Sequence, residues 1–383
     1  MPNLNTARFT LSGMVTKRSI KDRLDDRHLT VKDFGATGNG TTDDTSAIQA
    51  AFNTLYGSPG SPQGETGSTL TSKVLRFPAG DYKISQPLTL NRSYGATLIG
   101  AGSNQTRLFW SGAEVEGSQD YDGATPVGPP ISALIEAKDS WHQHIEGMTL
   151  DAGGVQDVAL RLMRFGNSPN HQSGSDGYYR DVCFTNATSN NILAGGEALA
   201  SERLYESCSF TNCPGNGIFL SHANALNHSF YNCYFANNGG GYKQFVGGCG
   251  VFSGCRFHNN TSFDIHHQQS TITVEACHST SRNFAILNGA ITACRHDHAS
   301  PGVFWSPSFT PPTLGLPYDA PTTCFADSPY VCLTGNHSTN GVLSTLNAGG
   351  YAVLMGNRFD NAAYKSTYYT AAGAGGWENG AAF

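Results

Sequence analysis

A repeated tripeptide, Phe-x-Asn, sets the strongest limit on how this chain can fold. It occurs at residues 184–186, 210–212, 235–237, 257–259 and 359–361, and the first four copies are spaced by 26, 25 and 22 residues. A period in the twenties is typical of stacked repeat architectures. Each phenylalanine is expected to point into the core, and each asparagine to occupy a turn where it tolerates left-handed backbone angles. Because parallel strands stack about 4.8 Å apart, these asparagines are expected to hydrogen-bond as a ladder.

The cysteines follow the same period. Cys208, Cys233 and Cys255 each precede a repeat phenylalanine by two residues, and Cys277 and Cys294 continue the series. Residues at one strand position share one face, so these thiols are expected to be buried as small apolar groups. Disulfides are the alternative interpretation of ten cysteines. No Cys-x-x-Cys pair is present, so no metal site is predicted, and the pattern suits folding in a reducing compartment.

The segment 31–52 contains the signals of a short strand, a glycine-rich turn and a helix. Val31 and Phe34 are typical strand residues, and three glycines follow them within six positions. Thr42 or Asp43 is expected to cap the helix, with the next acidic residue favouring its positive end. An apolar stripe at helical spacing, formed by Ile48, Ala51 and Phe52, then predicts a helix with one buried face.

This segment closely resembles the opening of the pectate-lyase-like superfamily. Residues 77–82 (Phe-Pro-Ala-Gly-Asp-Tyr) and 100–106 (Gly-Ala-Gly-Ser-Asn-Gln-Thr) fit the same pattern in the same order. The charged stretch 17–26 leads directly into 31–35, and this junction resembles the one in bacteriophage tailspike and tail-fibre proteins. The resemblance implies an all-β fold, a single-stranded right-handed parallel β-helix (a pectin-lyase-like solenoid) whose N-terminal end is capped by the helix.

Three parts are expected along the chain. Residues 1–30 are expected to form a virion-attachment or linker segment, residues 31–361 the β-helix, and residues 362–383 a C-terminal cap or subunit contact. Two stretches interrupt the repeats and are expected to be long surface loops: 111–132, rich in Gly, Pro and acids, and 299–323, rich in Pro. The acidic stretch is also compatible with a calcium site, but it lacks a defined ligand spacing.

The composition excludes several classes of partner. The formal net charge is −6, which argues against a general nucleic-acid binder, because phosphate binding needs clustered Lys and Arg. No stretch of about 20 apolar residues predicts a membrane span. The N-terminus shows no basic region followed by an apolar core, so no secretory signal is predicted. We therefore expect no nucleic-acid partner, no membrane partner and no cofactor.

The richest acidic stretch, residues 176–206, supplies the first set of candidate catalytic residues. Hydrolysis of a glycosidic bond usually needs two carboxyl groups that flank the bond. Glu197, Glu202 and Glu206 are the candidate catalytic acids, and Asp176 is a candidate substrate-binding residue. Aligning the repeats places Arg180 and Glu206 at the same coil position, one rung apart. A structural ion pair explains that pair as well as catalysis does, and a solvated edge is the alternative for the other acids.

The second set of candidates is Asp264 and His266, with Lys243 about one coil earlier. Asp264 and His266 alternate along the chain, so both are expected to project from one face of a strand, as an acid/base pair does. Lys243 is a candidate substrate-binding residue, because a lysine can neutralise a uronate carboxylate. The Asp-x-His string resembles the active site of alginate epimerases in this superfamily. Those enzymes carry Tyr-Gly before the Phe and Glu after the His, where this chain has Thr261-Ser262 and His267. Exposed turn residues are the alternative interpretation.

The function we predict is that of a phage tailspike. It would bind a host surface polysaccharide (capsule or O-antigen) and depolymerise it. Hydrolysis is favoured over elimination as the cleavage reaction. Relatives of this type are homotrimers, so the resemblance implies a homotrimer that contacts phage tail or adaptor proteins through residues 1–30. The protein would be assembled in the host cytoplasm and reside in the virion. Two alternatives stay open: a non-catalytic receptor-binding or structural tail protein, and a cellular polysaccharide lyase or epimerase. The motifs of polygalacturonases and pectate lyases are absent.

Overall fold

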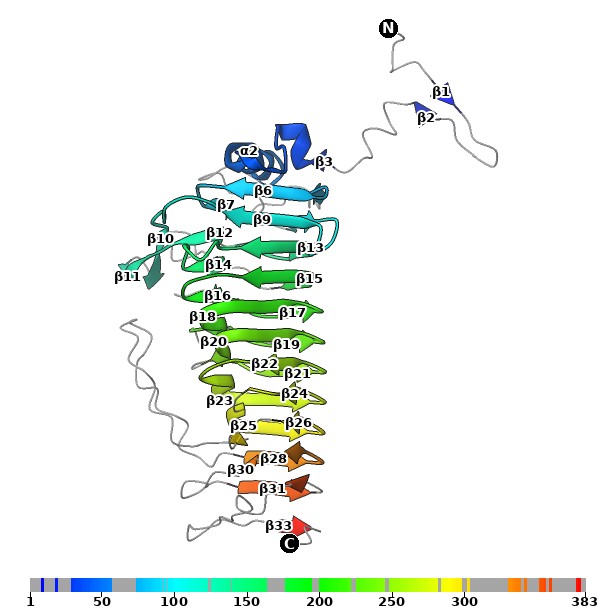
Figure 1. The fold of residues 1–383 in the computed structure, drawn as a ribbon, viewed down its shortest axis with the longest axis vertical. Coiled ribbons are helices and arrows are strands. Elements are labelled where there is room, and N and C mark those ends of the chain that lie inside the picture. The colour runs from blue at the N-terminus through cyan, green and yellow to red at the C-terminus, as the bar shows by residue number, and fades with distance from the viewer. Residues whose placement is uncertain are drawn as a thin grey trace.

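The chain folds into a stack of coils, with an α-helix and a short 3₁₀ helix at the N-terminal end of the stack (Figure 1). The structure is a computed structural model. It describes residues 8–9, 18–19, 29–56, 74–91, 93, 95–122, 125–138, 140–163, 176–194, 200–221, 225–244, 248–281, 284–297, 302–303, 330–338, 341–342, 351–355, 358–359 and 377–379. Within these residues, 27 strands join into one sheet. The chain is thus a single-stranded parallel β-helix, right-handed as parallel crossover connections almost always are.

The coils have three faces, each a ladder of parallel strands. The first face contains β3 (Leu29–Thr30), β5 (Val74–Arg76), β8 (Thr97–Ile99), β13 (Gln143–Asp151), β15 (Gly177–Thr185), β17 (Arg203–Glu206), β19 (His228–Tyr231), β21 (Gly250–Ser253), β23 (Phe263–Glu275), β25 (Phe284–Thr292), β28 (Tyr330–Thr334), β31 (Tyr351–Met355) and β33 (Trp377–Asn379). The long strands bend and also pair on a neighbouring face.

The second face continues from the first after a turn. It contains β4 (Asn39–Asp43), β6 (Gly80–Ile84), β9 (Thr106–Trp110), the ends of β13 and β15, β18 (Ser209–Leu220), β20 (Tyr234–Gln244), β22 (Arg256–His258), β24 (His278–Ser279), β26 (Arg295–His296), β29 (His337–Ser338) and β32 (Arg358–Phe359).

The third face closes each coil. It contains β7 (Leu88–Asn91), β12 (Ala133–Lys138), β14 (Val158–Met163), β16 (Asn190–Ala194), the ends of β18 and β20, and the starts of β23 and β25. Three smaller pairs lie outside the large sheet: β1 (Arg8–Phe9) with β2 (Arg18–Ser19), β10 (Ser118–Asp122) with β11 (Thr125–Ile131), and β27 (Gly302–Val303) with β30 (Gly341–Val342).

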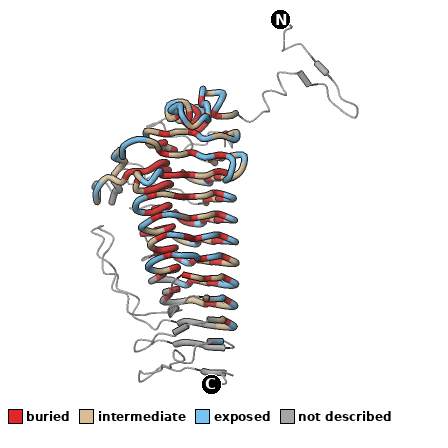
Figure 2. The backbone as a smooth tube through the Cα atoms, viewed as in Figure 1, coloured by how far each residue is buried: buried red, intermediate tan, exposed pale blue. Residues whose placement is uncertain are grey.

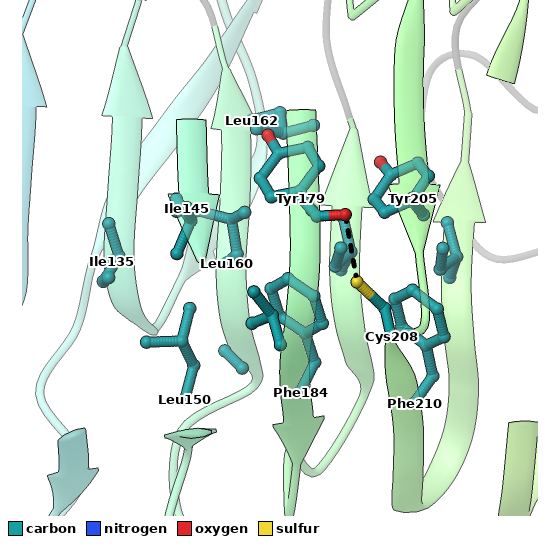
Figure 3. Packing of buried hydrophobic residues seen from close by; sticks show 14 of the residues in the cluster. Ile135, Ile145, Leu150, Leu160, Leu162, Tyr179, Phe184, Tyr205, Cys208 and Phe210 are labelled. Carbon is teal, nitrogen blue, oxygen red and sulfur yellow. Dashed lines mark hydrogen bonds between the residues drawn. The ribbon is translucent and has the colours of Figure 1, made fainter. Parts of the chain in front are cut away.

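Stacked aromatic rings fill the interior of the coils (Figure 3). The repeat phenylalanines Phe184, Phe210, Phe235 and Phe257 form one column, with centroids 5.3, 4.7 and 5.0 Å apart. A second column contains Tyr179, Tyr205, Phe230 and Phe252, spaced by 4.9, 4.7 and 4.4 Å. Such ring pairs contribute about 0.5–1.5 kcal/mol each beyond the apolar area they bury. Buried residues run along the interior of successive coils, while exposed residues gather at the turns (Figure 2).

The predicted asparagine ladder is present at the turn between the second and third faces. Asn186, Asn212, Asn237 and Asn259 all have left-handed φ values between 53° and 59°. Asn259 donates to Asn237 at 2.8 Å, and Asn237 donates to Asn212 at 3.2 Å. The ladder is interrupted after that, because Asn212 donates to the Thr185 hydroxyl.

The periodic cysteines are buried and reduced, as their spacing predicts. Cysteines with described side chains carry free thiols: Cys183, Cys208, Cys213, Cys233, Cys249, Cys255, Cys277 and Cys294. The Cys208 thiol donates to the Tyr179 carbonyl one coil earlier, at 3.3 Å (Figure 3). Burial raises the pKa of the Cys213 thiol to about 12. Cys249 differs from the others because it is exposed.

The N-terminal end is covered by α2 (Thr45–Tyr56), whose apolar stripe is buried. The Asp43 carboxylate accepts a hydrogen bond from the first helical amide, that of Thr45, at 3.0 Å. The Asp44 carboxylate accepts the amides of Thr37 and Gly38 at 2.7 and 2.9 Å, and this attaches the glycine-rich turn to the helix.

The strand expected at 31–34 is wrong. Those residues form a 3₁₀ helix, η1 (Val31–Phe34), and the strand lies just before it, at β3. The Asp33 carboxylate accepts the Thr30 amide at 2.7 Å, and Gly35 ends the helix at a φ of 100°. This capping arrangement outweighs the strand preference of the apolar residues.

The stretch 111–132 also differs from the expected loop, because β10 and β11 form an antiparallel hairpin that projects from the side of the stack (Figure 1). The buried Arg161 guanidinium holds the base of the hairpin by donating to the carbonyls of Ser118 and Ile131. The Ser118 amide in turn donates to Glu136 at 2.8 Å. Burial acts to raise the pKa of Glu136, but the Lys138 ammonium at 2.8 Å and other partners bring it below its usual value.

Most of the other expected parts of the chain lie outside the described residues. Of 1–30 the structure describes only three pairs of residues, and of 299–323 only β27. Within 362–383 it describes β33, which pairs in parallel with β31 as a further rung. The domain boundaries remain predictions.

Candidate functional site

The outward side of the first face gathers four carboxylates on three successive coils. We call Glu146, Asp176, Glu202 and Glu206 the acidic patch. Asp176 and Glu202 immediately precede β15 and β17, and Gly177 pairs with Arg203, so these two acids lie one rung apart. Adjacent strands lie about 4.8 Å apart, so the two side chains start from neighbouring rungs on the same side of the stack.

Both acids occupy the same turn of the coil. Asp176 has a φ of 61° and Glu202 a φ of 49°, and His142 and Asn227 at equivalent positions have 51° and 54°. Because four successive coils share this left-handed turn, it is part of the architecture and not strain confined to one site. The Asp176 carboxylate lies 3.2 Å from His142 Nδ1, and Glu202 accepts the Asn227 amide at 3.2 Å. Both carboxylates are accessible at the surface.

Glu206 lies on the strand itself, in register with Arg180, as the repeat alignment predicts. Arg180 nevertheless forms its ion pair with Glu146, on the other side. Glu206 accepts a hydrogen bond of 2.6 Å from the Tyr178 hydroxyl, and this bond raises the pKa of Tyr178. Tyr178 therefore remains a donor, and Glu206 is held in a defined position. Arg180 is half exposed, so its ion pair contributes little to stability.

Two exposed tyrosines extend the acidic patch toward the C-terminal coils. Tyr231 follows Glu206 in register and has 40% of its surface exposed. Tyr234 lies three residues later, across the turn on the second face, and is 37% exposed. Large hydrophobic side chains are otherwise rarely exposed among the described residues, Leu29 being the further case. Exposed rings beside carboxylates suit sugar rings, because a tyrosine offers an apolar face and a polar tip.

Sequence reasoning missed the two tyrosines. The available signal was their position: Tyr231 and Tyr234 flank the buried Cys233 in the repeat, where other coils carry small or charged residues.

The expectation that Asp264 and His266 share one face is wrong. Asp264 is fully buried and accepts hydrogen bonds from Asn260, Ser279 and Ser281. His266 instead pairs in register with Lys243 and packs edge-on against Phe263, with ring centroids 5.4 Å apart. Asp264 lies at the start of the third face, directly after the turn from the second face, and next to this turn the simple alternation of side chains does not hold. Asp264 therefore belongs to a buried hydrogen-bond network, which leaves no acid/base pair with His266.

Lys243 and His266 lie on adjacent strands, one coil apart as predicted. They are only 5% and 2% exposed, respectively, and the Lys243 ammonium lies 4.9 Å from the centre of the Phe219 ring. Burial, together with the charge of Lys243, lowers the pKa of His266 to about 3. His266 is thus a neutral imidazole beside a cation, in a site covered from solvent.

Glu197 lies outside the described residues, so its place relative to the acidic patch remains a prediction. Within the described part of the chain, no group of three or more His, Cys, Asp or Glu side chains is arranged to hold a metal ion. None of the described helices is long and apolar enough to cross a bilayer.

Comparison with known families decides the relationship of the chain. Residues 29–262 match the family model described as rhamnogalacturonase A/epimerase, pectate lyase-like. The chain belongs to this family. The matched region runs from β3 through the coils that carry the acidic patch and the two tyrosines, and it confirms the pectate-lyase-like resemblance of the N-terminal segment.

Curated relatives differ in their named activities. The chain is 26% identical over 249 residues to a probable glucan endo-1,3-beta-glucosidase of Arthroderma benhamiae, covering 57% of this chain and 26% of the relative. It is 25% identical over 268 residues to the mannuronan C5-epimerase AlgE3 of Azotobacter vinelandii, covering 68% of this chain and 12% of the relative. The chain thus spans about a quarter or less of the length of these relatives.

Solved structures share the fold. The gp42 tailspike of an Acinetobacter phage superposes with a TM-score of 0.59 at 13% identity, covering 88% of this chain and 58% of that one. The tailspike of Escherichia coli bacteriophage HK620, solved in complex with a hexasaccharide, superposes with a TM-score of 0.56 at 12% identity, covering 93% and 66%. At these identities the likeness establishes the β-helix and nothing further.

Proposed function

We propose that this chain is the β-helical part of a phage tailspike that binds a host surface polysaccharide. The observation that carries the proposal is the pair of exposed tyrosines, Tyr231 and Tyr234, next to Glu206 on the outside of a rigid solenoid. A sugar ring can stack on each tyrosine while the carboxylate accepts its hydroxyls. The tailspike fold neighbours, one of them solved with a hexasaccharide, support this proposal by analogy.

We further propose that the polysaccharide is cut by hydrolysis at the acidic patch. Asp176 and Glu202 are accessible and lie one rung apart, and we propose that they act as the two carboxyl groups of a retaining mechanism. In that mechanism one carboxyl protonates the leaving oxygen and the other attacks the anomeric carbon, after which water releases the product. Glu206, held by Tyr178, would orient the sugar.

Elimination or epimerisation of a uronic acid is the second candidate. The observation that favours it is the neutral His266 beside Lys243, because a base and a cation that neutralises the uronate carboxylate are what such chemistry needs. We favour hydrolysis over this second candidate because both side chains are buried. A non-catalytic adhesin would use the same tyrosines without cleavage.

Assembly and location form part of the same proposal. The protein would act as a homotrimer in the virion, attached to tail or adaptor proteins through residues 1–30, after assembly in the host cytoplasm. Long solenoid sides favour association.

The test is to incubate the purified protein with capsule or O-antigen polysaccharides from candidate hosts and to analyse the products by mass spectrometry. Hydrolysis adds water to each product, and Glu202→Gln should abolish it while Glu116→Gln, an exposed acid near the hairpin, leaves it unchanged. Products with an unsaturated end would show that cleavage occurs by elimination, and the catalytic residues would then be His266 and Lys243. Polymer that is bound but not cut would support the alternative of a non-catalytic adhesin. Absence of binding to every polysaccharide would refute the tailspike proposal.

A further inference from the structure

A column of basic side chains runs along the outside of the second face. Consecutive register pairs connect Tyr234 to Arg256, Arg256 to His278, His278 to Arg295, Arg295 to His337 and His337 to Arg358. We call Arg256, His278, Arg295, His337 and Arg358 the basic stripe. It occupies five successive coils at steps of about 4.8 Å. Tyr234, one of the two exposed tyrosines, forms its N-terminal end.

The stripe is open to solvent. Arg256 and Arg358 are exposed, and the side chain of Arg295 is 62% exposed. The Asp297 carboxylate lies against the middle of the stripe: its Oδ2 contacts Arg295 Nε and lies 3.2 Å from His278 Nε2. The guanidinium groups of Arg256 and Arg295 outweigh this one carboxylate, so this part of the stripe stays positive even with a neutral His278. The chain as a whole has the opposite sign, with a formal net charge of −6.

The fold itself gives no reason for this column. The column of alternating Arg and His side chains places no opposite charges in register on adjacent strands, so it gains no cross-strand ion pairs there. Earlier coils accommodate the neutral Cys183 and Ser209 at the same position in register. A column of cations on a rigid ladder is instead suited to a partner that carries repeated negative charges.

A second copy of this chain is a poor match for that partner. The acidic patch could in principle complement the stripe, but it lies on the coils of β13, β15 and β17, whereas the stripe begins at β22. In Figure 1 these coils lie at different heights along the axis. Copies arranged side by side in parallel would therefore not bring the two surfaces together.

We infer that the basic stripe binds an acidic polysaccharide, with a carboxylate on its sugars, that lies parallel to the axis of the β-helix. This inference rests on the proposed function and specifies its substrate class. The guanidinium groups of Arg256 and Arg295 bind sugar carboxylates through paired hydrogen bonds. A sugar ring stacks on Tyr234 and leads the chain toward Tyr231 and Glu206. An extended pyranose chain advances by a length similar to one coil step per sugar, so carboxylates along it can meet the guanidinium groups, which recur at every second coil of the stripe.

The experiment measures binding of the full chain to alginate and polygalacturonate, which carry one carboxylate per sugar, and to neutral laminarin. Biolayer interferometry at low and at high salt gives the affinities. The test variant is Arg256→Gln/Arg295→Gln, and the control is Lys32→Gln/Arg76→Gln, which removes the same charge from exposed positions near the N-terminal end. Thermal unfolding of each variant verifies that the fold is intact.

We expect salt-sensitive binding of an acidic polymer and none of laminarin. The double stripe variant should weaken binding about tenfold, or 1.4 kcal/mol, while the control double variant changes nothing. Equal affinity of the stripe variant and the wild type would overturn the inference. So would complete competition by single-stranded DNA, which would mean that any polyanion suffices.

Two further outcomes separate this inference from the proposed function. Cleavage of a neutral host polysaccharide, with no binding of either acidic polymer, would refute acidic-polysaccharide binding at the basic stripe. The same result would still support the proposed tailspike function. Failure to bind any polysaccharide, host capsules included, overturns both.

Discussion

The buried imidazole of His228 predicts a specific loss of stability in acid. Its side chain is fully buried beside the stacked rings of Tyr205 and Phe230, with centroids 6.0 and 6.4 Å away, and its Nε2 donates to the Ala200 carbonyl at 2.5 Å. Burial, reinforced by the nearby Arg203 charge, lowers the pKa of His228 to about 3. In the unfolded chain the same group titrates at about 6.5.

The sign and size of the effect follow from this difference. Between about pH 6.5 and pH 3 the unfolded chain binds a proton at this site and the folded protein does not, so the free energy of unfolding falls as the pH falls. The slope is about 1.4 kcal/mol per pH unit, so about 2.7 kcal/mol is lost two units below the unfolded pKa. Above about pH 6.5 His228 contributes no pH dependence.

The assay is denaturant unfolding near pH 7.5 and near pH 4.5, with His228→Gln as the test variant. Glutamine keeps an N–H donor for the Ala200 carbonyl but does not titrate. Other groups titrate in the wild type and in the variant alike, so the difference between their acid losses, about 2.7 kcal/mol, isolates His228. His258→Gln is the control, because His258 is exposed and bonds to Thr280 at the surface. Equal acid losses in wild type and His228→Gln would refute the reasoning.

The packing and the buried polar contacts lead to three further predictions. Phe210→Ala should lower the free energy of unfolding by about 3–5 kcal/mol, measured by denaturant unfolding, because Phe210 stacks between Phe184 and Phe235 at 5.3 and 4.7 Å; a loss under about 1 kcal/mol would contradict a packed column. Asp264→Ala should lower the unfolding temperature by several degrees, because the buried donors that bond to this carboxylate would lose their acceptor. A variant with full stability that no longer cleaves the polysaccharide would instead indicate a catalytic role for Asp264. Arg161→Gln should release the β10–β11 hairpin to limited proteolysis while the coils resist; an equally resistant hairpin would show that other contacts suffice.

Several features of the fold were predictable because a solenoid makes three-dimensional neighbours out of residues one period apart. The spacing of the repeat phenylalanines predicted their column, and the register of Arg180 with Glu206 and the pairing of Lys243 with His266 followed from the same period. The asparagine ladder and the buried thiols were predictable for the same reason.

The basic stripe also has a signal in the sequence. Four of its residues directly follow a buried Cys or Asn of the repeat: Cys255, Cys277, Cys294 and Asn336. Charge that recurs at one offset from the periodic cysteines therefore marks the column in the amino-acid sequence alone.

The period, the rungs and the family are properties of the amino-acid sequence, because they depend on contacts between adjacent coils. Whether each polar side chain points into the coil or out to solvent is a property of the tertiary structure. The inward position of Asp264, just after a turn, and the exposure of Tyr231, at the end of β19, both depend on where the chain turns a corner between faces. At a corner the alternation of inward and outward side chains is interrupted. The order of polar and apolar residues therefore does not predict which way a side chain points there, and the backbone conformation decides it.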